Sequence, residues 1–423
     1  MAKEKIITGI DIGSTKISTT IAAITENRVS VIGVSGNVVS KGIKKGNVID
    51  IDAAVEAIFS SIERAERMAG VSVSSAYVSL NGGHIETLNS HGVVAVSPSQ
   101  SSEITREDMA RVIEAAQAVS LPSSREIVHV LPRDFIVDSQ EGIKDPVGMS
   151  GVRLEVETNI IHGSSTAMKN LTKCIAQVGV EVEELVYTGV AAAEAVLTDT
   201  EKELGTLLVD IGGGTTSVIA FLDGSPLYSV VLPIGGKLIT SDLAIGLRTR
   251  LEDAEKIKLK LSVDASMPKQ PYEFTNTNPK KNDEFDVSEF GLDVPTVSKN
   301  LLYRIIDSRL EEIFRLIALE ISKANLTGKL PAGVVVTGGA ALTAGVERVA
   351  KMTLKGPVRI GIPKGVTGLI DEIQGPASAV SVGIVLYGLN ASKSGRLLSF
   401  DSDRGNMKKT LAKFFEKIKS FLP

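Results

Sequence analysis

Two stretches, Ile10-Asp11-Ile12-Gly13-Ser14-Thr15 and Val209-Asp210-Ile211-Gly212-Gly213-Gly214-Thr215, repeat one phrase in the two halves of the chain. Each follows an apolar run, at residues 6–10 and 207–209, and precedes another, so each predicts a hairpin with a tight turn. Gly, Ser and Thr in such a turn let backbone N–H groups approach an anion, and the preceding Asp can hold a hydrated Mg²⁺. Two such hairpins that face each other would grip the phosphates of a nucleotide.

Two further patterns support a nucleotide site. Residues 334–342 form an apolar run that ends in Gly338-Gly339 and continues in a helix-like segment, and such a turn can expose backbone to a base or ribose. Glu255 and Lys258 share a face of an expected helix at i, i+3, although such a pair alone is typical of a solvated salt bridge. Neither G-x-x-x-x-G-K-[ST] nor G-x-G-x-x-G occurs in the chain, so no competing nucleotide motif is present.

Taken in this order, the four patterns resemble those of the actin-like ATPase superfamily, whose members bind ATP and Mg²⁺ between two RNase H-like lobes. The resemblance covers most of the chain and implies an α/β fold, with ATP and Mg²⁺ as cofactors. The residues that it assigns to the nucleotide are Asp11, Gly13, Ser14, Thr15, Lys16, Asp210, Gly212, Gly213, Gly214, Thr215, Gly236, Glu255, Lys258, Gly338 and Gly339. Asp11 and Asp210 would hold the Mg²⁺ ion through water.

An inserted module is expected after Leu80-Asn81-Gly82-Gly83. Residues 93–96, 126–136 and 154–161 are typical of strands, and Thr105 precedes a helical pattern as an N-cap. Within the superfamily, an insert at this place resembles that of the FtsA family of bacterial cell-division proteins. Members of that family also end in a linker and an amphipathic membrane-targeting helix.

The last residues of the chain predict such a helix. Residues 391–406 are rich in Ser, Asp and Gly, as in a flexible linker. In residues 407–423 apolar side chains recur at helical spacing and lysines occupy the other face. The apolar set is Leu411, Phe414, Phe415, Ile418, Phe421 and Leu422, and the lysines are Lys408, Lys409, Lys413, Lys417 and Lys419.

Charge sets this helix apart from the rest of the chain. From Arg404 onward there are six basic residues and one acidic residue, whereas the remainder has 40 basic and 49 acidic residues. Helices with Phe and Leu on one face and Lys on the other lie in the plane of a membrane, where each Lys contributes about 1 kcal/mol near an anionic leaflet. We therefore expect peripheral binding to an anionic membrane surface. Docking of the helix on its own body, or on a partner, is the alternative.

Composition predicts a soluble cytoplasmic body of two lobes. A chain of 423 residues exceeds one compact core, and 23% charged with 43% hydrophobic residues is typical of globular proteins. Cys174 is the single cysteine, which excludes an internal disulfide framework and fits a reducing compartment. No apolar stretch of signal-peptide type or of bilayer-spanning length is found. No nucleic-acid partner is expected.

The resemblance to FtsA also implies partners. They are other copies of the chain in a homopolymer, the C-terminal peptide of FtsZ, and other divisome proteins, at the division site on the cytoplasmic face of the cell membrane. Residues 266–295, with four prolines, predict exposed loops and short strands in a small subdomain that would dock the peptide. The following helix, residues 297–325, offers Lys299, Arg304 and Arg309 to an acidic peptide, although basic helix faces are more often solvated.

These patterns divide the chain into segments, several of which return to the same lobe. In chain order they are the first-lobe core (1–83), the insert (84–161), the first lobe again (162–204), the second-lobe core (205–242), its small subdomain (243–306), the second-lobe core again (307–360), a return to the first lobe (361–390), the linker (391–406) and the membrane-targeting helix (407–423).

No residue is identified for orienting an attacking water. Phosphoryl transfer depends mainly on positioning, so binding residues alone do not predict turnover. Heat-shock chaperones of this superfamily carry a Glu just before a Pro-Thr-Ala-Ala-Ala run, whereas the matching residues 187–192 contain no acid and Glu194 comes later. We expect at most a slow ATPase, in which ATP closes the cleft and promotes assembly. The alternatives are a PilM-like pilus-assembly adaptor, which is the closest rival, an actin-fold chaperone and a sugar kinase.

Overall fold

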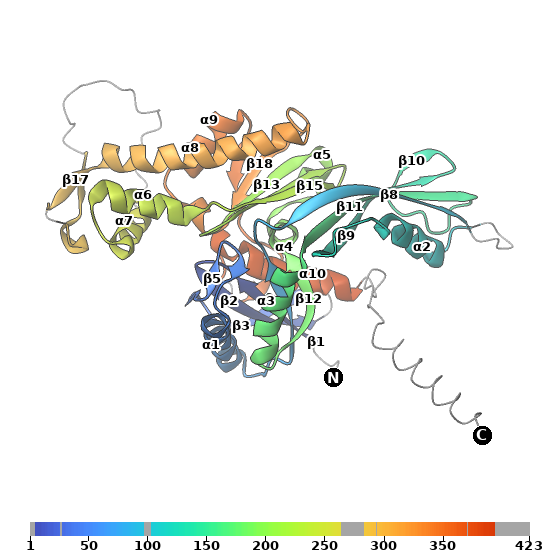
Figure 1. The fold of residues 1–423 in the computed structure, drawn as a ribbon, viewed down its shortest axis with the longest axis horizontal. Coiled ribbons are helices and arrows are strands. Elements are labelled where there is room, and N and C mark those ends of the chain that lie inside the picture. Colours follow the sequence, from blue (N-terminus) through green and yellow to red (C-terminus); the bar gives the residue numbers. More distant parts are fainter. Residues whose placement is uncertain are drawn as a thin grey trace.

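The computed structural model describes residues 5–25, 28–96, 103–263, 283–292, 294–369 and 371–393. The predicted membrane helix and most of the predicted linker lie outside these residues, as does most of the predicted proline-containing loop segment. Figure 1 shows a first lobe in blue and green, a second lobe above it in yellow and orange, and the insert projecting to the right.

The first lobe is built on one sheet whose central strands are buried on both faces. Its strands are β1 (Lys5–Ile12), β2 (Lys16–Thr25), β3 (Arg28–Val34), β4 (Val38–Val39), β7 (Ser75–Leu80), β12 (Glu181–Tyr187) and β20 (Thr367–Gly368). The order is β12-β7-β1-β2-β3-β20, and β4 pairs with β2. Ile12 of β1 lies opposite Ile17 of antiparallel β2. The first Asp-Ile-Gly motif therefore lies at the end of β1, where the predicted hairpin turns. Helices α1 (Ile51–Ala69), α3 (Ser165–Gln177) and α10 (Ala379–Lys393) complete the lobe.

The second lobe repeats this plan. Its sheet contains β13 (Thr206–Ile211), β14 (Thr216–Leu222), β15 (Ser225–Leu232), β18 (Gly333–Thr337) and β19 (Val358–Ile360). The order is β15-β14-β13-β18-β19, and antiparallel β13 and β14 form the second predicted hairpin. The lobe's remaining elements are α5 (Asp199–Leu204), α6 (Gly236–Leu247), α7 (Leu251–Val263), β16 (Glu284–Asp286), η1 (Ser288–Phe290), β17 (Thr296–Ser298), α8 (Lys299–Lys323), η2 (Gly339–Leu342) and α9 (Val346–Leu354).

The insert has its own sheet and core. Strands β8 (Glu86–Ala95), β9 (Arg125–Val137), β10 (Gln140–Ile143) and β11 (Arg153–Ser164) pair in the order β10-β9-β11-β8, and α2 (Arg106–Gln117) packs on them. Thr105 caps α2 in a capping box with Asp108, as its sequence predicts. Residues 93–95 of the expected strand form the end of β8, which begins earlier and pairs with β11 from Glu86 onward through polar residues.

Two helices of small residues cross closely between the lobes (Figure 1). They are α4 (Thr188–Val196) and α10. A Cβ atom built on Gly383 of α10 would lie 1.8 Å from the carbonyl oxygen of Ala191 in α4, so only glycine allows this contact. Helix α10 extends to Lys393, and the predicted linker start at residue 391 is therefore too early.

Gly383→Ala should destabilise the protein by about 2 kcal/mol, because the added methyl group forces α4 and α10 apart. Urea unfolding measures this as a lower midpoint. Gly246→Ala in α6 is a matched control, since its methyl group would meet the flexible end of Ile305 at 2.8 Å and helix propensity favours Ala. Equal midpoints for Gly383→Ala and the unaltered chain would contradict the close crossing.

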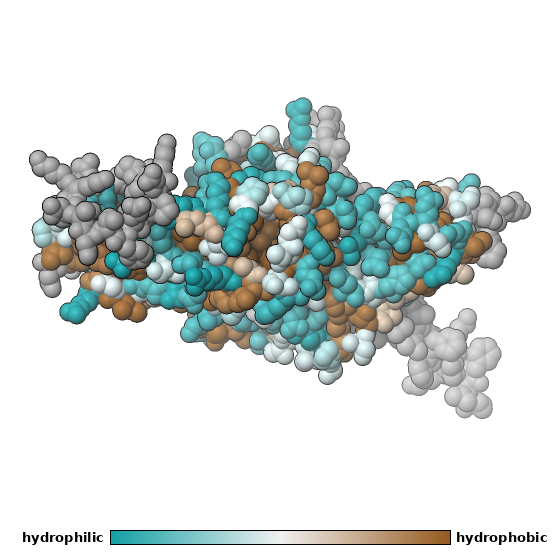
Figure 2. Space-filling model, turned by 90° about the horizontal axis from the view of Figure 1, so that it is seen from above, coloured by the Kyte–Doolittle hydropathy of each residue, from teal (hydrophilic) through white to brown (hydrophobic). Residues whose placement is uncertain are grey.

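The surface that carries α8 is mainly hydrophilic, with hydrophobic residues in small groups between the charged ones (Figure 2). Single exposed apolar side chains such as Leu301 and Leu319 are ordinary on a protein surface. Within the described ranges, no helix combines the length and apolar character needed to cross a bilayer.

Candidate functional site

Both Asp-Ile-Gly phrases end in tight hairpin turns of the same geometry. In the first turn the N–H of Gly13 donates to the carbonyl oxygen of Lys16 at 3.0 Å. In the second, the N–H of Gly212 donates to the carbonyl oxygen of Thr215 at 2.9 Å. The structure therefore repeats one turn geometry in the two lobes, at the residues predicted to bind phosphate. We call residues 13–16 the first loop and residues 212–215 the second loop.

The two loops contact each other. A Cβ atom on Gly213 would lie 1.5 Å from Thr15 Oγ1, and one on Gly214 would lie 2.9 Å from the Ser14 side chain. Lys237, which follows the second hairpin, donates from Nζ to the carbonyl oxygen of Ser14 at 2.8 Å. Glycine is thus required where the lobes meet, and the predicted loop residues face one another across the interlobe contact.

Asp11 and Asp210 are buried at the strand ends that precede the loops. Burial raises the pKa of Asp11, and the charge of Lys16 and a hydrogen bond from Ser79 partly oppose this rise. Burial together with the negative charge of Asp11 raises the pKa of Asp210 to about 7, and Lys16 partly offsets this. Lys16 is itself anchored by donation from Nζ to the carbonyl oxygen of Ala377 at 2.7 Å. Two buried carboxylates with raised pKa values beside one lysine fit a divalent cation, because Mg²⁺ prefers oxygen ligands.

Asp210→Asn should stabilise the ligand-free protein at pH 8 but not at pH 4. The pKa of Asp210 is raised from 3.8 to about 7 in the folded state. Ionisation is therefore penalised on folding, and the penalty grows as the pH rises from about 4 to 7 and is constant above that range. Thermal unfolding of Asp210→Asn and of the unaltered chain between pH 4 and 8, without Mg²⁺ or nucleotide, measures this penalty as a difference in Tm. A pH-independent difference in Tm would contradict the raised pKa.

The predicted base-binding turn lies beside the second loop. Gly338, between β18 and η2, has φ of +88°, and a Cβ there would lie 2.3 Å from Asp210 Oδ1. Gly236 at the start of α6 packs on η2, since its Cβ would lie 2.9 Å from that of Ala340. Gly339 follows Gly338 at the start of η2. The structure thus brings the residues predicted for phosphate and for adenosine into one neighbourhood.

The predicted ribose pair extends this neighbourhood through α6. Lys258 Nζ lies 2.7 Å from Glu255 Oε2 and donates to Thr240 Oγ1 at 2.9 Å. Thr240 also hydrogen-bonds to Glu255 and, through the carbonyl oxygen of Gly236, to the start of its own helix. Lys258 is buried, whereas the i, i+3 spacing alone is typical of a solvated pair. Because Lys258 is buried and bonds to both Glu255 and Thr240, it fixes the position of the Glu255 carboxylate, which an exposed ion pair on the helix surface would not do.

Three residues of this site are absent from the sequence-based assignment. Asn81 Nδ2 donates to Thr215 Oγ1 at 3.1 Å, Lys237 bonds to the first loop, and Thr240 connects α6 with α7. Lys237 and Thr240 belong to one Gly-Gly-Lys stretch after the second hairpin, which was a usable signal. Asn81 ends a buried strand, but its partner lies in the other half of the chain.

Glu194 points away from the loops. Its carboxylate lies 3.1 Å from Lys202 Nζ and accepts from Asn390 Nδ2 at 2.9 Å. Within the matching residues 187–192, Thr188 shares a hydrogen bond of 3.0 Å with Ser217. This geometry supplies no carboxylate to orient water at residues 187–192.

The residues predicted to bind a peptide all lie on α8, where Arg309 is held by partners on α6 and α8. Its guanidinium binds Asp242 of α6 through two bonds, of 2.6 Å and 2.8 Å, and also pairs with Glu312. A peptide carboxylate would have to compete with Asp242 for this group. Arg304 is exposed and Lys299 half-buried at the start of the helix.

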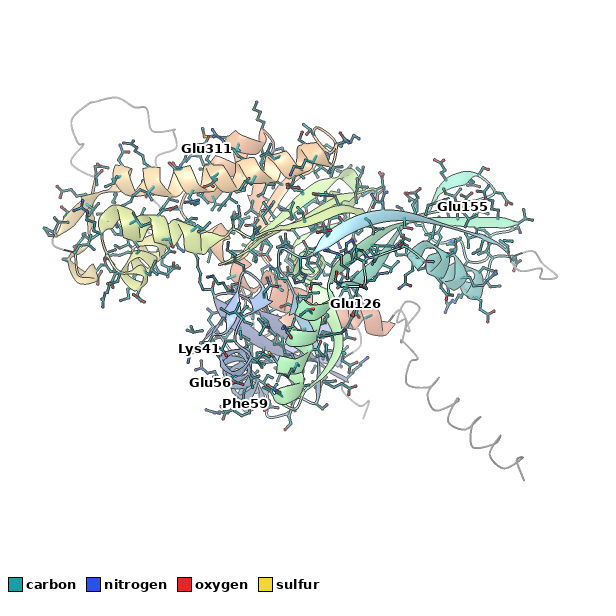
Figure 3. All side chains as sticks on the ribbon, viewed as in Figure 1. Lys41, Glu56, Phe59, Glu126, Glu155 and Glu311 are labelled. Atoms are coloured by element: carbon teal, nitrogen blue, oxygen red, sulfur yellow. The ribbon has the colours of Figure 1, made fainter. Side chains whose placement is uncertain are left out.

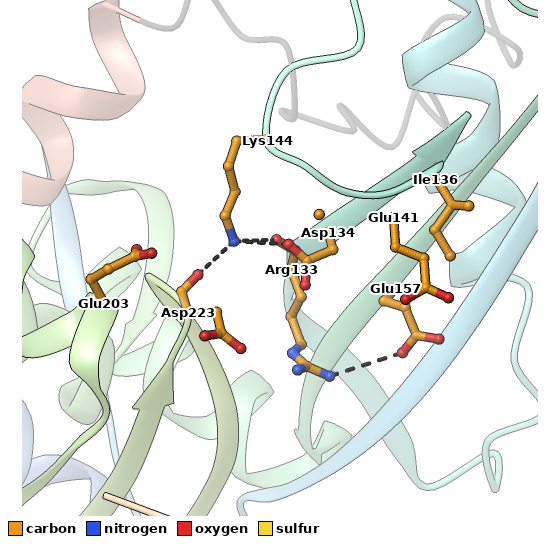
Figure 4. A pocket seen from close by; sticks show the side chains of 9 residues that line it. Arg133, Asp134, Ile136, Glu141, Lys144, Glu157, Glu203 and Asp223 are labelled. Atoms are coloured by element: carbon orange, nitrogen blue, oxygen red, sulfur yellow. Dashed lines mark hydrogen bonds and ion pairs between the residues drawn. The ribbon is translucent and has the colours of Figure 1, made fainter. Parts of the chain in front are cut away.

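A separate polar cleft of 580 Å³ lies between the insert and the second lobe, away from the loops (Figure 4). Lys144 of the insert crosses it, donating to Asp134 Oδ1 at 2.8 Å and to the carbonyl oxygen of Asp223 at 2.5 Å. Arg133 lies 3.9 Å from Glu157 on its wall. The cleft therefore marks a contact between the two parts rather than the nucleotide site.

The two sheets, their repeated loops and the small-residue helices between them define an actin-like ATPase fold. Solved structures share this fold. The PilM-PilN type IV pilus biogenesis complex matches with a TM-score of 0.60 at 16% identity, covering 90% of this chain and 98% of that one. MreB5 of Spiroplasma citri bound to ADP matches with a TM-score of 0.50 at 15% identity, covering 92% and 98%.

Sequence comparison identifies the family of the chain within this fold class. Residues 82–162 match the family described as "SHS2 domain inserted in FTSA", and residues 207–383 match "Cell division protein FtsA". The FtsA proteins of Pseudomonas aeruginosa and Bacillus subtilis are 35% and 37% identical to the chain, covering 99% and 95% of it and 97% and 87% of their own lengths. The chain belongs to the FtsA family of cell-division proteins. Identity of this extent favours FtsA over the PilM-like alternative, for which only the fold is shared.

Proposed function

We propose that the chain binds Mg²⁺ and ATP between its two lobes, polymerises on the cytoplasmic face of the cell membrane and tethers the FtsZ ring there, where it recruits later divisome proteins. The observation that carries this proposal is the meeting of the two loops beside the buried Asp11 and Asp210 and the half-buried Lys16. The loops offer backbone N–H groups and lysine to phosphates, and the carboxylates offer oxygen to a hydrated Mg²⁺.

Slow turnover is part of this proposal. Glu194 is held by Lys202 and Asn390, and no acid lies between Tyr187 and Ala192. Without a group that orients water, ATP serves mainly as a ligand that favours the closed arrangement of the lobes. Polymerisation would then follow nucleotide binding, and many weak anchors in one filament would hold it on the membrane.

The small subdomain made of α6, α7, β16, β17 and α8 is proposed to dock the FtsZ C-terminal peptide. Support comes from Arg304, which is exposed on α8, and from Lys299 at its start. Arg309 is proposed to contribute by exchanging Asp242 for a peptide carboxylate, because bidentate contacts of arginine suit either partner.

One experiment tests the proposed function as a whole. Purified protein, with Mg²⁺ and ATP on an anionic lipid monolayer, should form filaments visible by electron microscopy and should retain a fluorescent FtsZ C-terminal peptide. The same protein without ATP, and a scrambled peptide of equal charge, are the controls. Filaments that retain both peptides equally would reject the docking assignment, and an absence of ATP-dependent filaments would reject the assembly assignment.

A further inference from the structure

The insert leaves and re-enters the first lobe through two connections that are bonded to each other. His84 in the outgoing connection accepts a hydrogen bond at Nδ1 from the N–H of Ser164 in the returning one, at 3.3 Å. Arg125 of β9 donates from Nη2 to the carbonyl oxygen of His84 and from Nε to His162 Nδ1, each at 2.7 Å. A displacement of the outgoing connection therefore moves the base of the whole insert.

Asn81, the first residue of the outgoing connection, bonds to the second lobe with both ends of its amide. Oδ1 accepts from the N–H of Gly82 at 2.8 Å and from Ser217 Oγ at 3.2 Å. Because a backbone N–H can only donate, this contact fixes Oδ1 toward Gly82 and leaves Nδ2 to donate to Thr215 Oγ1 at 3.1 Å. Thr215 is the last residue of the second loop.

The first loop reaches the same connection from the other side. Ser14 Oγ accepts from the N–H of Gly46, at 3.0 Å, in the turn between β5 (Ile43–Lys44) and β6 (Asn47–Val48). Gly46 has φ of +78°, and a Cβ there would lie 2.7 Å from both N and Cα of Gly82. Both loops thus contact Asn81-Gly82, one through a side-chain amide and the other through a turn that only glycine can form.

We infer that Asn81 is a positioning residue that transmits nucleotide occupancy from the second loop to the insert. This inference rests on the proposed nucleotide function. Thr15 and Gly213 are in contact, so phosphates between the loops require the loops to shift, and Thr215 shifts with the second loop. The Asn81 amide then carries that displacement into the connection that His84 and Arg125 join to the insert. Loss of the amide should weaken nucleotide binding moderately and uncouple the insert from it.

The test compares Asn81→Ala with the unaltered chain by calorimetry and by hydrogen exchange, with and without saturating Mg·ADP. Of the hydrogen bonds that Asn81→Ala removes, the one to Thr215 reaches the second loop, and its loss should raise the Kd about three- to tenfold. In the unaltered chain, exchange in β8 and β11 should change on binding, whereas in Asn81→Ala that difference should vanish. Ser217→Ala, which removes the hydroxyl that donates to Oδ1 and that also bonds to Thr188, should reduce the difference and serves if Asn81→Ala does not fold.

Asn159→Ala is the matched control. Asn159 of β11 also joins the insert to the second lobe, through Nδ2 to the carbonyl oxygen of Leu227 at 3.1 Å, but neither loop contacts it. Its replacement should speed exchange in both states and preserve the nucleotide-dependent difference. A full difference in both Asn81→Ala and Ser217→Ala, or no difference in an unaltered chain that binds Mg·ADP, would overturn the inference. No binding by the unaltered chain would instead reject the proposed nucleotide site, and this inference with it.

Discussion

Asp11→Ala should weaken the binding of Mg·ATP by about ten- to a hundredfold, the range for losing a group that orients a metal's coordination sphere. Asp11 is buried at the end of β1, beside Lys16 and in the field of Asp210. In this arrangement it supplies one of two carboxylates for a hydrated Mg²⁺. Nucleotide-dependent polymerisation should decline in parallel, because it depends on the same ligand. Isothermal calorimetry with Mg·ATP and light scattering measure the two effects.

Asp11→Asn separates this loss from misfolding. Burial raises the pKa of Asp11, which means that its charge is penalised in the folded, ligand-free protein, so a neutral isostere should not lower the unfolding temperature above pH 6. The control is Glu311→Gln, which removes a carboxylate on the outer side of α8 that pairs with Arg315 (Figure 3). Unchanged affinity in Asp11→Asn and Asp11→Ala would reject the site assignment.

The local parts of the fold were predictable because their causes are local. Each Asp-Ile-Gly phrase sits between apolar runs that pair directly with each other, and Thr105 and Asp108 cap a helix within four residues of chain. The long helix expected over residues 297–325 is α8, Lys299–Lys323.

The contacts that assemble the candidate site were harder to predict because they join distant segments. Asn81 bonds to Thr215 and Lys237 bonds to Ser14, and no pattern of spacing connects such residues. The spacing of Glu255 and Lys258 is typical of a solvated pair, whereas in the structure Lys258 is buried and bonds to Thr240 of another helix. In the same way, the sequence offers Arg309 on α8 to a peptide, whereas in the structure Arg309 is already paired with Asp242 of α6.

Removal of residues 407–423 should abolish binding to anionic vesicles, with a loss of at least about a hundredfold in apparent affinity. Each Lys near an anionic leaflet contributes about 1 kcal/mol, and the predicted polar face holds five, before any burial of Phe and Leu is counted. Co-sedimentation with vesicles that contain anionic lipid measures the loss. Retained binding after the deletion would show that another surface holds the membrane.

Two matched variants distinguish insertion from charge attraction. The double variant Phe414→Ser with Phe415→Ser keeps every lysine but removes apolar area. The double variant Lys413→Gln with Lys417→Gln keeps the apolar side chains but removes two positive charges. If the segment inserts in the membrane plane, the first pair should lose binding at all salt concentrations, whereas the second should lose it mainly at low salt, where surface charges are least screened. Mg·ATP affinity should stay unchanged in all three, because both loops lie in the body that ends with α10. A deletion that reduced nucleotide affinity as well would instead favour docking of the segment on its own body.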